Sequence, residues 1–128
     1  MFVRKAELDA TTMSPPRNGQ GSAIRRDYLK NPMQVMQNTK AQSGSLTHPM
    51  LQTFSYMELQ PNSYIGDHAH TTEAEVYYII EGQGVISDNG QTYEVQVGDF
   101  LYTADGNTHA LKNTSADKPL KFIAFFVK

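Results

Sequence analysis

The chain has 128 residues, which is near the usual size of one domain and leaves no room for a second core. Hydrophobic residues make up 39% and charged residues 19% of it, and the formal net charge is -2. This balance argues against nucleic acid or an anionic membrane as a partner. No apolar run follows the charged residues of the first ten positions, so we expect neither a signal peptide nor a membrane span, and a cytoplasmic location.

Residues 1–22 are predicted to form an extended arm that either packs on its own barrel or on a partner subunit. Residues 11–22 contain two prolines, two glycines and several small polar side chains, which cannot bury enough apolar surface to fold alone. Residues 23–28 alternate weakly and predict an edge strand. Residues 30–45, rich in Gln, Asn and Met, predict one turn of helix at most.

Short apolar runs separated by turn residues predict a series of strands from Leu51 onward. Asp88-Asn89-Gly90 lies between two such runs and predicts a hairpin, because Asn and Gly tolerate the positive φ that a tight turn needs. Closely spaced short strands predict an all-β sandwich or small barrel over residues 23–128. The predicted strands are 51–59, 75–80, 85–87, 91–97, 100–103, 109–112 and 120–127.

Two of these strands are apolar on both faces. In residues 75–80 and 120–127, aromatic and branched side chains occupy both the odd and the even positions. A sheet with one solvated face normally alternates apolar and polar residues, so something covers the second face. High aromatic content in a small β domain explains either strand alone as well. The two strands together favour a homodimer.

Three of the four histidines and one glutamate form a candidate metal site. His68 and His70 are two residues apart, so on a strand both side chains point to one face. Glu75 opens the next strand and His109 begins a later one, and imidazole and carboxylate are ligands for a divalent transition metal. Such a site keeps positive charge and open positions, and thus attracts an anionic oxygen ligand. Because the histidines must be neutral to bind, affinity is expected to fall as the pH drops through about 6.

The glycine framework around these four residues resembles the two motifs of the cupin superfamily, G(X)5HXH(X)3-4E(X)6G and G(X)5PXG(X)2H(X)3N. The first corresponds to residues 62–82, with Asn62 in the leading glycine position and Gly82 at the end. The second corresponds to residues 98–113, with Ala104 in the proline position. Every internal spacing is kept. The fifteen residues between the motifs resemble the short connection of small single-domain cupins.

The resemblance implies a jelly-roll barrel with an ion near its centre, bound by His68, His70, Glu75 and His109. Cupins carry Mn, Fe, Ni, Co, Cu or Zn, and the residues do not choose among these metals. Tyr77 shares strand parity with Glu75, and Tyr64 precedes the first motif histidine. Both are candidate ligand-binding residues, although packing and surface roles explain them as well. His48 lies outside the motifs, and no ligating role is expected for it.

Two functions of different class follow from this resemblance. The first is a metal-dependent enzyme acting on a small oxygen-rich substrate with a carbonyl, carboxylate or sugar-like group, as an oxygenase, isomerase, cyclase or lyase. The second is a non-enzymatic, metal-assisted binding module for a sugar or small acid. The cupin fold hosts both, so it does not name the reaction.

Overall fold

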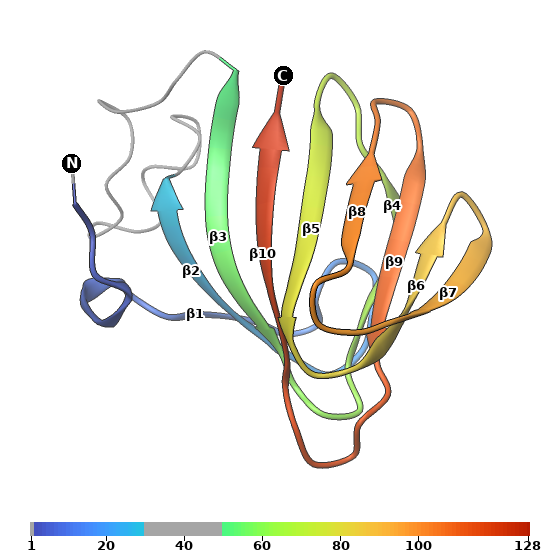
Figure 1. Cartoon of the computed structure of the whole chain (residues 1–128), viewed down its shortest axis with the longest axis horizontal. Coiled ribbons are helices and arrows are strands. Elements are labelled where there is room, and N and C mark those ends of the chain that lie inside the picture. Colours follow the sequence, from blue (N-terminus) through green and yellow to red (C-terminus); the bar gives the residue numbers. More distant parts are fainter. Residues whose placement is uncertain (1, 30–49) are drawn as a thin grey trace.

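The computed structural model describes residues 2–29 and 50–128 (Figure 1). The helical turn predicted within residues 30–45 and the position of His48 therefore lie outside the described residues. The described elements are a 3-10 helix, Lys5–Glu7, and ten strands: β1 Thr11–Met13, β2 Ala23–Leu29, β3 Leu51–Leu59, β4 Tyr64–Ala69, β5 Ala74–Glu81, β6 Gly84–Asp88, β7 Gln91–Val95, β8 Phe100–Thr103, β9 Thr108–Asn113 and β10 Leu120–Val127. In this part of the chain, no helix is long and apolar enough to span a membrane.

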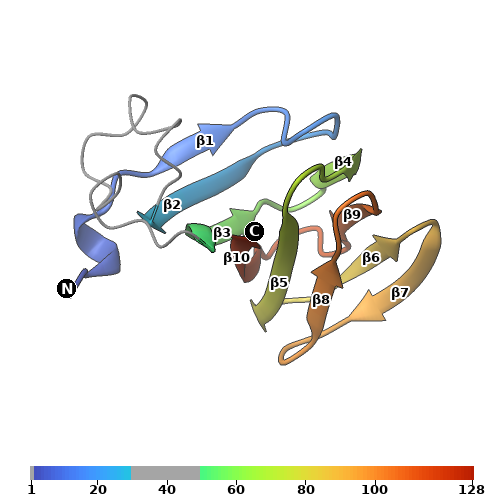
Figure 2. The ribbon, with the colours of Figure 1, turned by 90° about the horizontal axis from the view of Figure 1, so that it is seen from above.

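The strands form two antiparallel sheets that face each other. The six-stranded sheet has the order β1-β2-β3-β10-β5-β8, and the four-stranded sheet has the order β4-β9-β6-β7. Seen from above in Figure 2, β3, β10, β5 and β8 lie opposite the four-stranded sheet. The predicted all-β architecture is confirmed. The boundaries predicted for β3, β8 and β10 agree with those observed.

The core lies between the facing sheets. Phe122 on β10 is fully buried and pairs in register with Met57 of β3 and Ile79 of β5. Leu111 on β9 and Ile86 on β6 meet this layer from the opposite sheet. The predicted hairpin joins β6 and β7, and Asn89 and Gly90 have φ of 49° and 85°. These are the left-handed conformations that the turn requires.

Two asparagines of the motifs, Asn62 and Asn113, stabilise turns of the chain. Asn62 has φ of 59°, so it takes the conformation expected of the glycine it replaces. The amide nitrogen of Asn113 donates to the carbonyl oxygens of Leu59, Gln60 and Lys118, at 3.0, 3.2 and 2.8 Å. Asn113 thereby ties the end of β9 to the loop before β4, the strand that carries His68.

The amino-terminal arm packs on its own chain within the described residues. β1 pairs with β2, so residues 23–29 form an inner strand instead of the predicted edge strand, and β1 occupies the edge. The loop between β1 and β2 lies beside β4 (Figure 2), where Gln20 pairs with Tyr64. A Cβ on Gly66 would lie 2.3 Å from the carbonyl oxygen of Asn18, so glycine is needed for this close approach. Packing of the arm on a partner stays a prediction.

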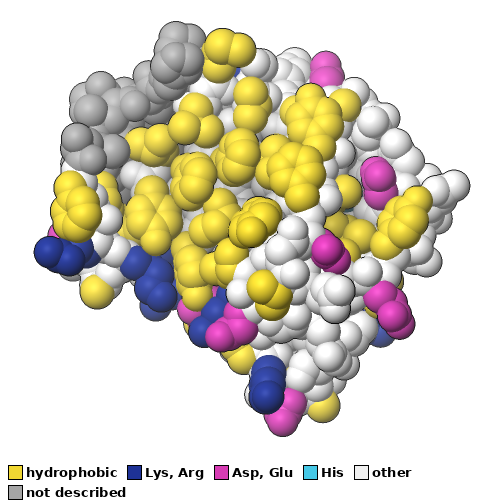
Figure 3. Space-filling model, viewed as in Figure 1, with side chains coloured by type: hydrophobic (Ala, Val, Ile, Leu, Met, Phe, Trp, Pro, Cys, Tyr) yellow, Lys and Arg dark blue, Asp and Glu magenta, His cyan; other side chains and the backbone are white. Residues whose placement is uncertain are grey.

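The outer face of the six-stranded sheet is broadly apolar (Figure 3). Phe54, Phe125, Val76 and Tyr102 follow one another in register across four strands, and the rings of Phe54 and Phe125 stack at 5.4 Å. A second row runs through Tyr56, Ile123, Tyr78 and Phe100. Tyr78, Phe100 and Tyr102 are 45%, 64% and 55% exposed. The apolar second face predicted for β5 and β10 is therefore observed.

Candidate metal centre

The two sheets together bring the four predicted ligands to one place. His68 lies on β4 and pairs in register with His109 on β9, while His70 follows the end of β4. Glu75 lies on β5 in the opposite sheet, beside Phe126 and Thr103. All four side chains are buried. Residues far apart in the chain thus meet between the sheets.

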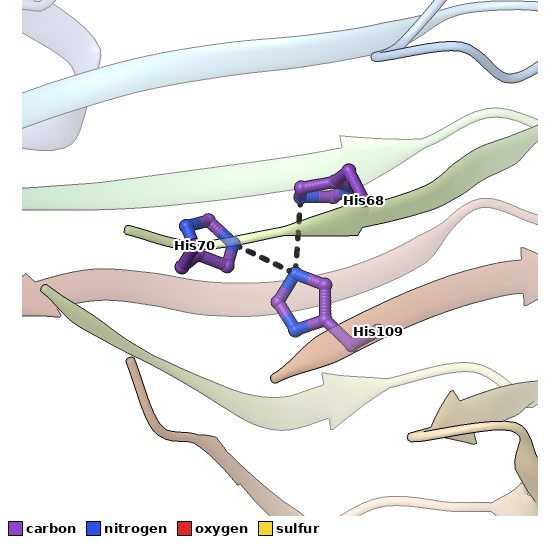
Figure 4. A group of neighbouring side chains, drawn as sticks. All are labelled: His68, His70 and His109. Atoms are coloured by element: carbon purple, nitrogen blue, oxygen red, sulfur yellow. Dashed lines mark hydrogen bonds between the residues drawn. The ribbon is translucent and has the colours of Figure 1, made fainter. Parts of the chain in front are cut away.

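The three imidazole rings converge through their Nε2 atoms (Figure 4). The Nε2 atom of His109 lies 3.1 Å from that of His68 and 3.1 Å from that of His70. Two nitrogens bound at about 2.1 Å and at right angles to one ion would be about 3.0 Å apart, whereas tetrahedral ligation would set them about 3.4 Å apart. The observed spacing fits adjacent ligands of an octahedral ion.

Hydrogen bonds at the far side of two rings orient them. The Nδ1 atom of His68 lies 2.7 Å from the carbonyl oxygen of Gly66, which can only accept, so Nδ1 carries the proton and Nε2 offers its lone pair. The Nδ1 atom of His109 lies 2.7 Å from the hydroxyl of Thr103, which is fully buried. A metal ion at this point would bind the lone pairs of all three Nε2 atoms at once.

Burial keeps the histidines neutral. Desolvation, followed by the neighbouring His68, lowers the pKa of His70 to about 4. Desolvation, followed by His68 and His70, lowers the pKa of His109 to about 3. The pKa of His68 is also lowered, again mainly by desolvation. Neutral imidazole is the form that binds a metal, so the rings are ready as ligands at neutral pH.

Glu75 is the fourth member of the cluster. Among the described residues that line the cavity, it is the only one with a carboxylate. Its oxygens lie 3.4 Å from Nε2 of His70 and 3.5 Å from Nε2 of His109. Burial raises the pKa of Glu75 to about 7, although a hydrogen bond from the Tyr77 hydroxyl opposes the rise. With neutral histidines and a half-protonated carboxyl group at pH 7, these contacts are not ion pairs. A divalent cation would supply the missing positive charge.

A small cavity of about 100 Å³ opens onto the cluster. Since one water occupies about 30 Å³ in the liquid, this volume corresponds to about three water molecules. The lining side chains come from both sheets and from the arm: Met13, Arg17, Arg25, Ser55, Met57, Ile65, His68, His70, Glu75, Tyr77, Ala124 and Phe126.

The two tyrosines of the sequence prediction lie in different places. Tyr77 is buried, lines the cavity, and stacks on His109 with ring centroids 4.8 Å apart. Burial, followed by the neighbouring Glu75, raises the pKa of Tyr77 well above its usual value, so the hydroxyl stays protonated as a donor to that carboxylate. Tyr64 does not line this cavity. It borders a separate surface depression with Gln20 and Lys112.

Sequence reasoning missed Arg17, Arg25 and Thr103. Arg25 belongs to a strand with charged residues on both faces, so alternation did not indicate which of them points inward. Arg17 lies in the arm, which had no periodicity to interpret. Thr103 immediately precedes Ala104 of the second motif. The one sequence signal for an inward side chain was that Thr103 lies two residues after the apolar Leu101, and therefore on the same face of the strand.

Comparison with known proteins places these features in a family. The sequence model of the cupin domain matches residues 55–126. A Thermotoga maritima protein named oxalate-binding protein is 32% identical over 127 residues, which cover 99% of this chain and 93% of that protein. The crystal structure of a predicted oxalate decarboxylase from T. maritima superposes with a TM-score of 0.83 and 31% identity, over 99% of this chain and 98% of that one.

More distant structures share the fold alone. The polyketide cyclase RemF of Streptomyces resistomycificus superposes with a TM-score of 0.70 at 17% identity, over 99% of this chain and 78% of that one. The predicted jelly-roll barrel of the cupin type is thereby confirmed.

Proposed function

Because the chain belongs to the cupin family, we propose that it binds one divalent transition metal through His68, His70, Glu75 and His109 and uses the ion to take up a small acid. The observation that carries this proposal is the convergence of three imidazole Nε2 atoms, with that of His109 3.1 Å from each of the other two. Four ligands around an octahedral ion leave two open positions. When bound, such an ion acts as a Lewis acid on a coordinated carboxylate or carbonyl oxygen.

The cavity supports an acid of few atoms as the ligand. About 100 Å³ is well below the roughly 300 Å³ at which pockets for drug-sized ligands begin. A sugar or a polyketide is larger than this space and would extend beyond it. The name of the T. maritima relative, oxalate-binding protein, agrees with a ligand of this size.

We propose an enzyme as the first form of this function, within the oxygenase, isomerase, cyclase or lyase classes. We place lyase chemistry on a small acid first, in line with the description of the T. maritima structure as a predicted oxalate decarboxylase. In such chemistry, the chain would hold the substrate against the ion, exclude water, and keep the protonated Tyr77 hydroxyl as a hydrogen-bond donor beside Glu75. Arg17 and Arg25 add positive charge to the same cavity.

A metal-assisted binding protein without turnover is the second form. The observation that favours it is that Glu75 is the one carboxylate among the described cavity-lining residues, so that no separate general acid and base are present as a carboxylate pair.

Elemental analysis of protein purified without added metal, followed by reconstitution, tests the shared part of both forms. We expect one ion per chain. Absence of stoichiometric metal before and after reconstitution would contradict both forms. Mass spectrometry of oxalate, malonate and related small acids after incubation with the loaded protein then separates them, since an enzyme produces a new species and a binding protein returns the acid unchanged.

We also propose a homodimer that buries the apolar outer face of the six-stranded sheet. Its two in-register aromatic rows are exposed at Tyr78, Phe100 and Tyr102, and apolar faces of this extent mark interaction surfaces. A second copy of the same face is its proposed occupant, because an apolar sheet face is complementary to itself across a two-fold axis.

A further inference from the structure

Arg25 lines the metal cavity and carries a buried hydrogen-bond donor. It lies on β2 with the same strand parity as Ala23 and Asp27, both of which are buried. Its Nε atom donates to Oδ1 of Asp27 at 2.6 Å. Its Nη2 atom is buried and has no hydrogen-bond partner among the described residues. A guanidinium nitrogen left in this state strongly favours an incoming anion.

The guanidinium group is held in place by residues beneath it. Asp27 is 1% exposed and accepts a hydrogen bond from the Ser55 hydroxyl at 2.5 Å, and the two residues pair in register across β2 and β3. Because Asp27 is fixed by Ser55, it fixes the fork of Arg25 in turn. The unpaired Nη2 is therefore a positioned donor whose orientation does not depend on the ligand.

Arg17 adds a second cation at the same cavity. It lies in the loop between β1 and β2, and its carbonyl oxygen accepts a hydrogen bond from the Gly66 amide at 3.2 Å. Gly66 is also the residue whose carbonyl orients His68. The arm is thus anchored two residues from the first predicted ligand, and it delivers Arg17 to the cavity lining.

We propose that Arg25, with Arg17 beside it, forms an anion-binding subsite within the metal cavity, so that the ligand is a small molecule with two acidic groups. One group would meet the ion and the other the guanidinium group of Arg25. This inference rests on the proposed function and names its ligand class. A cavity of about three water volumes holds two carboxylates joined directly or through one carbon. Two cationic centres in one cavity, the ion and the arginine pair, favour a ligand with two acidic groups.

Calorimetric titration of the metal-loaded full chain tests the subsite, with oxalate, malonate and acetate as the probes. We expect the unaltered protein to bind one of the two diacids at least tenfold more tightly than acetate. Arg25→Met should weaken diacid binding about 10- to 100-fold, the range of a lost charge-assisted hydrogen bond, and should change acetate binding little. Arg25→Lys, which keeps the charge beside Asp27 but loses the planar fork, should fall in between.

Arg26→Met is the matched control, because Arg26 is the next residue along β2 and pairs with Glu58 at 3.7 Å instead of lining the cavity. It should bind the diacids as the unaltered protein does. The inference is overturned if Arg25→Met and Arg25→Lys keep full diacid affinity, or if the loaded protein prefers acetate. Metal content, measured on every sample, distinguishes this failure from failure of the metal site: a chain that takes up no ion contradicts the proposed function itself. If Arg25→Met does not fold, Arg25→Lys and Arg17→Met carry the comparison, and unchanged diacid affinity in both overturns the inference.

Discussion

His68 and His109 are direct partners in the register of β4 and β9, and their Nε2 atoms lie 3.1 Å apart although the residues are separated by 41 positions in the chain. Strand pairing therefore sets the spacing of these two imidazoles. The hairpin formed by β6 and β7 is inserted between the motifs, so its length does not disturb the pairing.

Replacement of His109 with alanine should lower metal affinity by roughly 100-fold or more while the barrel stays folded. The side chain is fully buried and touches both other histidines, and its loss removes one of four predicted ligands. Metal content after dialysis and far-ultraviolet circular dichroism provide the two readouts. His48→Ala, at the histidine outside the motifs, is the control. Full metal retention by His109→Ala would show that His109 is not a ligand.

Thr103→Val should lower metal affinity by about 10- to 100-fold without removal of any ligand. The hydroxyl of Thr103 lies 2.7 Å from Nδ1 of His109, and partners of this kind orient a ligating imidazole. Valine keeps the shape of the side chain. Competition with a fluorescent chelator measures the affinity, and Thr103→Ser, which restores a hydroxyl, should recover most of it. Equal affinities for threonine and valine would contradict an orienting role.

Metal affinity should decline below pH 7, at a higher pH than ordinary histidine pKa values suggest. The pKa of Glu75 is raised to about 7, so its carboxyl group must release a proton before it can bind the ion. One such proton corresponds to about a tenfold loss of affinity for each pH unit below 7. His70 and His109, with pKa values of about 4 and about 3, add competition only in more acidic solution. Titrations between pH 5 and 8 measure the slope, and Glu75→Gln should flatten it.

Glu75→Gln should stabilise the metal-free protein at pH 8. The pKa of Glu75 is raised from 4.5 to about 7 on folding, so this residue imposes no penalty below about pH 4.5, a growing one between about pH 4.5 and 7, and the full one above about pH 7. A shift of this size corresponds to about 3 kcal/mol. Urea unfolding of chelated protein should show the gain at pH 8 and little difference at pH 4.5. A destabilised variant at pH 8 would mean that the ionised carboxylate has a partner that repays its burial.

Charged substitutions on the outer face should dissociate the proposed dimer. Phe100→Asp and Tyr102→Asp place carboxylates within the two aromatic rows, where a second copy would have to bury them. Sedimentation velocity at micromolar concentration should show a dimer for the unaltered protein and a monomer for the double variant. Tyr93→Asp is the control, since Tyr93 is 51% exposed but lies on β7 in the other sheet. A monomeric unaltered protein would remove the dimer proposal.

The amino-acid sequence by itself indicated most of the strands and a candidate ligand set, although it did not indicate β1. The apolar runs and the turn residues that flank them suffice to predict β3 and β10, because both signals lie within or next to the strand itself. The four predicted ligands followed from the spacing of two motifs. Each motif is a short continuous stretch of sequence, one before and one after the β6–β7 hairpin. The motifs could therefore be recognised without knowledge of which strands pair.

Only the tertiary structure decided which other side chains meet those ligands. β2 carries charges on both faces, and its pairing with β3 determines that Arg25 and Asp27 turn inward while Arg26 turns outward. The tertiary structure also decided the place of Tyr64. This residue lies within the first motif, but its side chain borders a separate surface depression and not the cavity. The raised pKa of Glu75 depends on desolvation by residues distant in the chain. Orientation and desolvation arise from contacts between sheets, and no local pattern of residues encodes them.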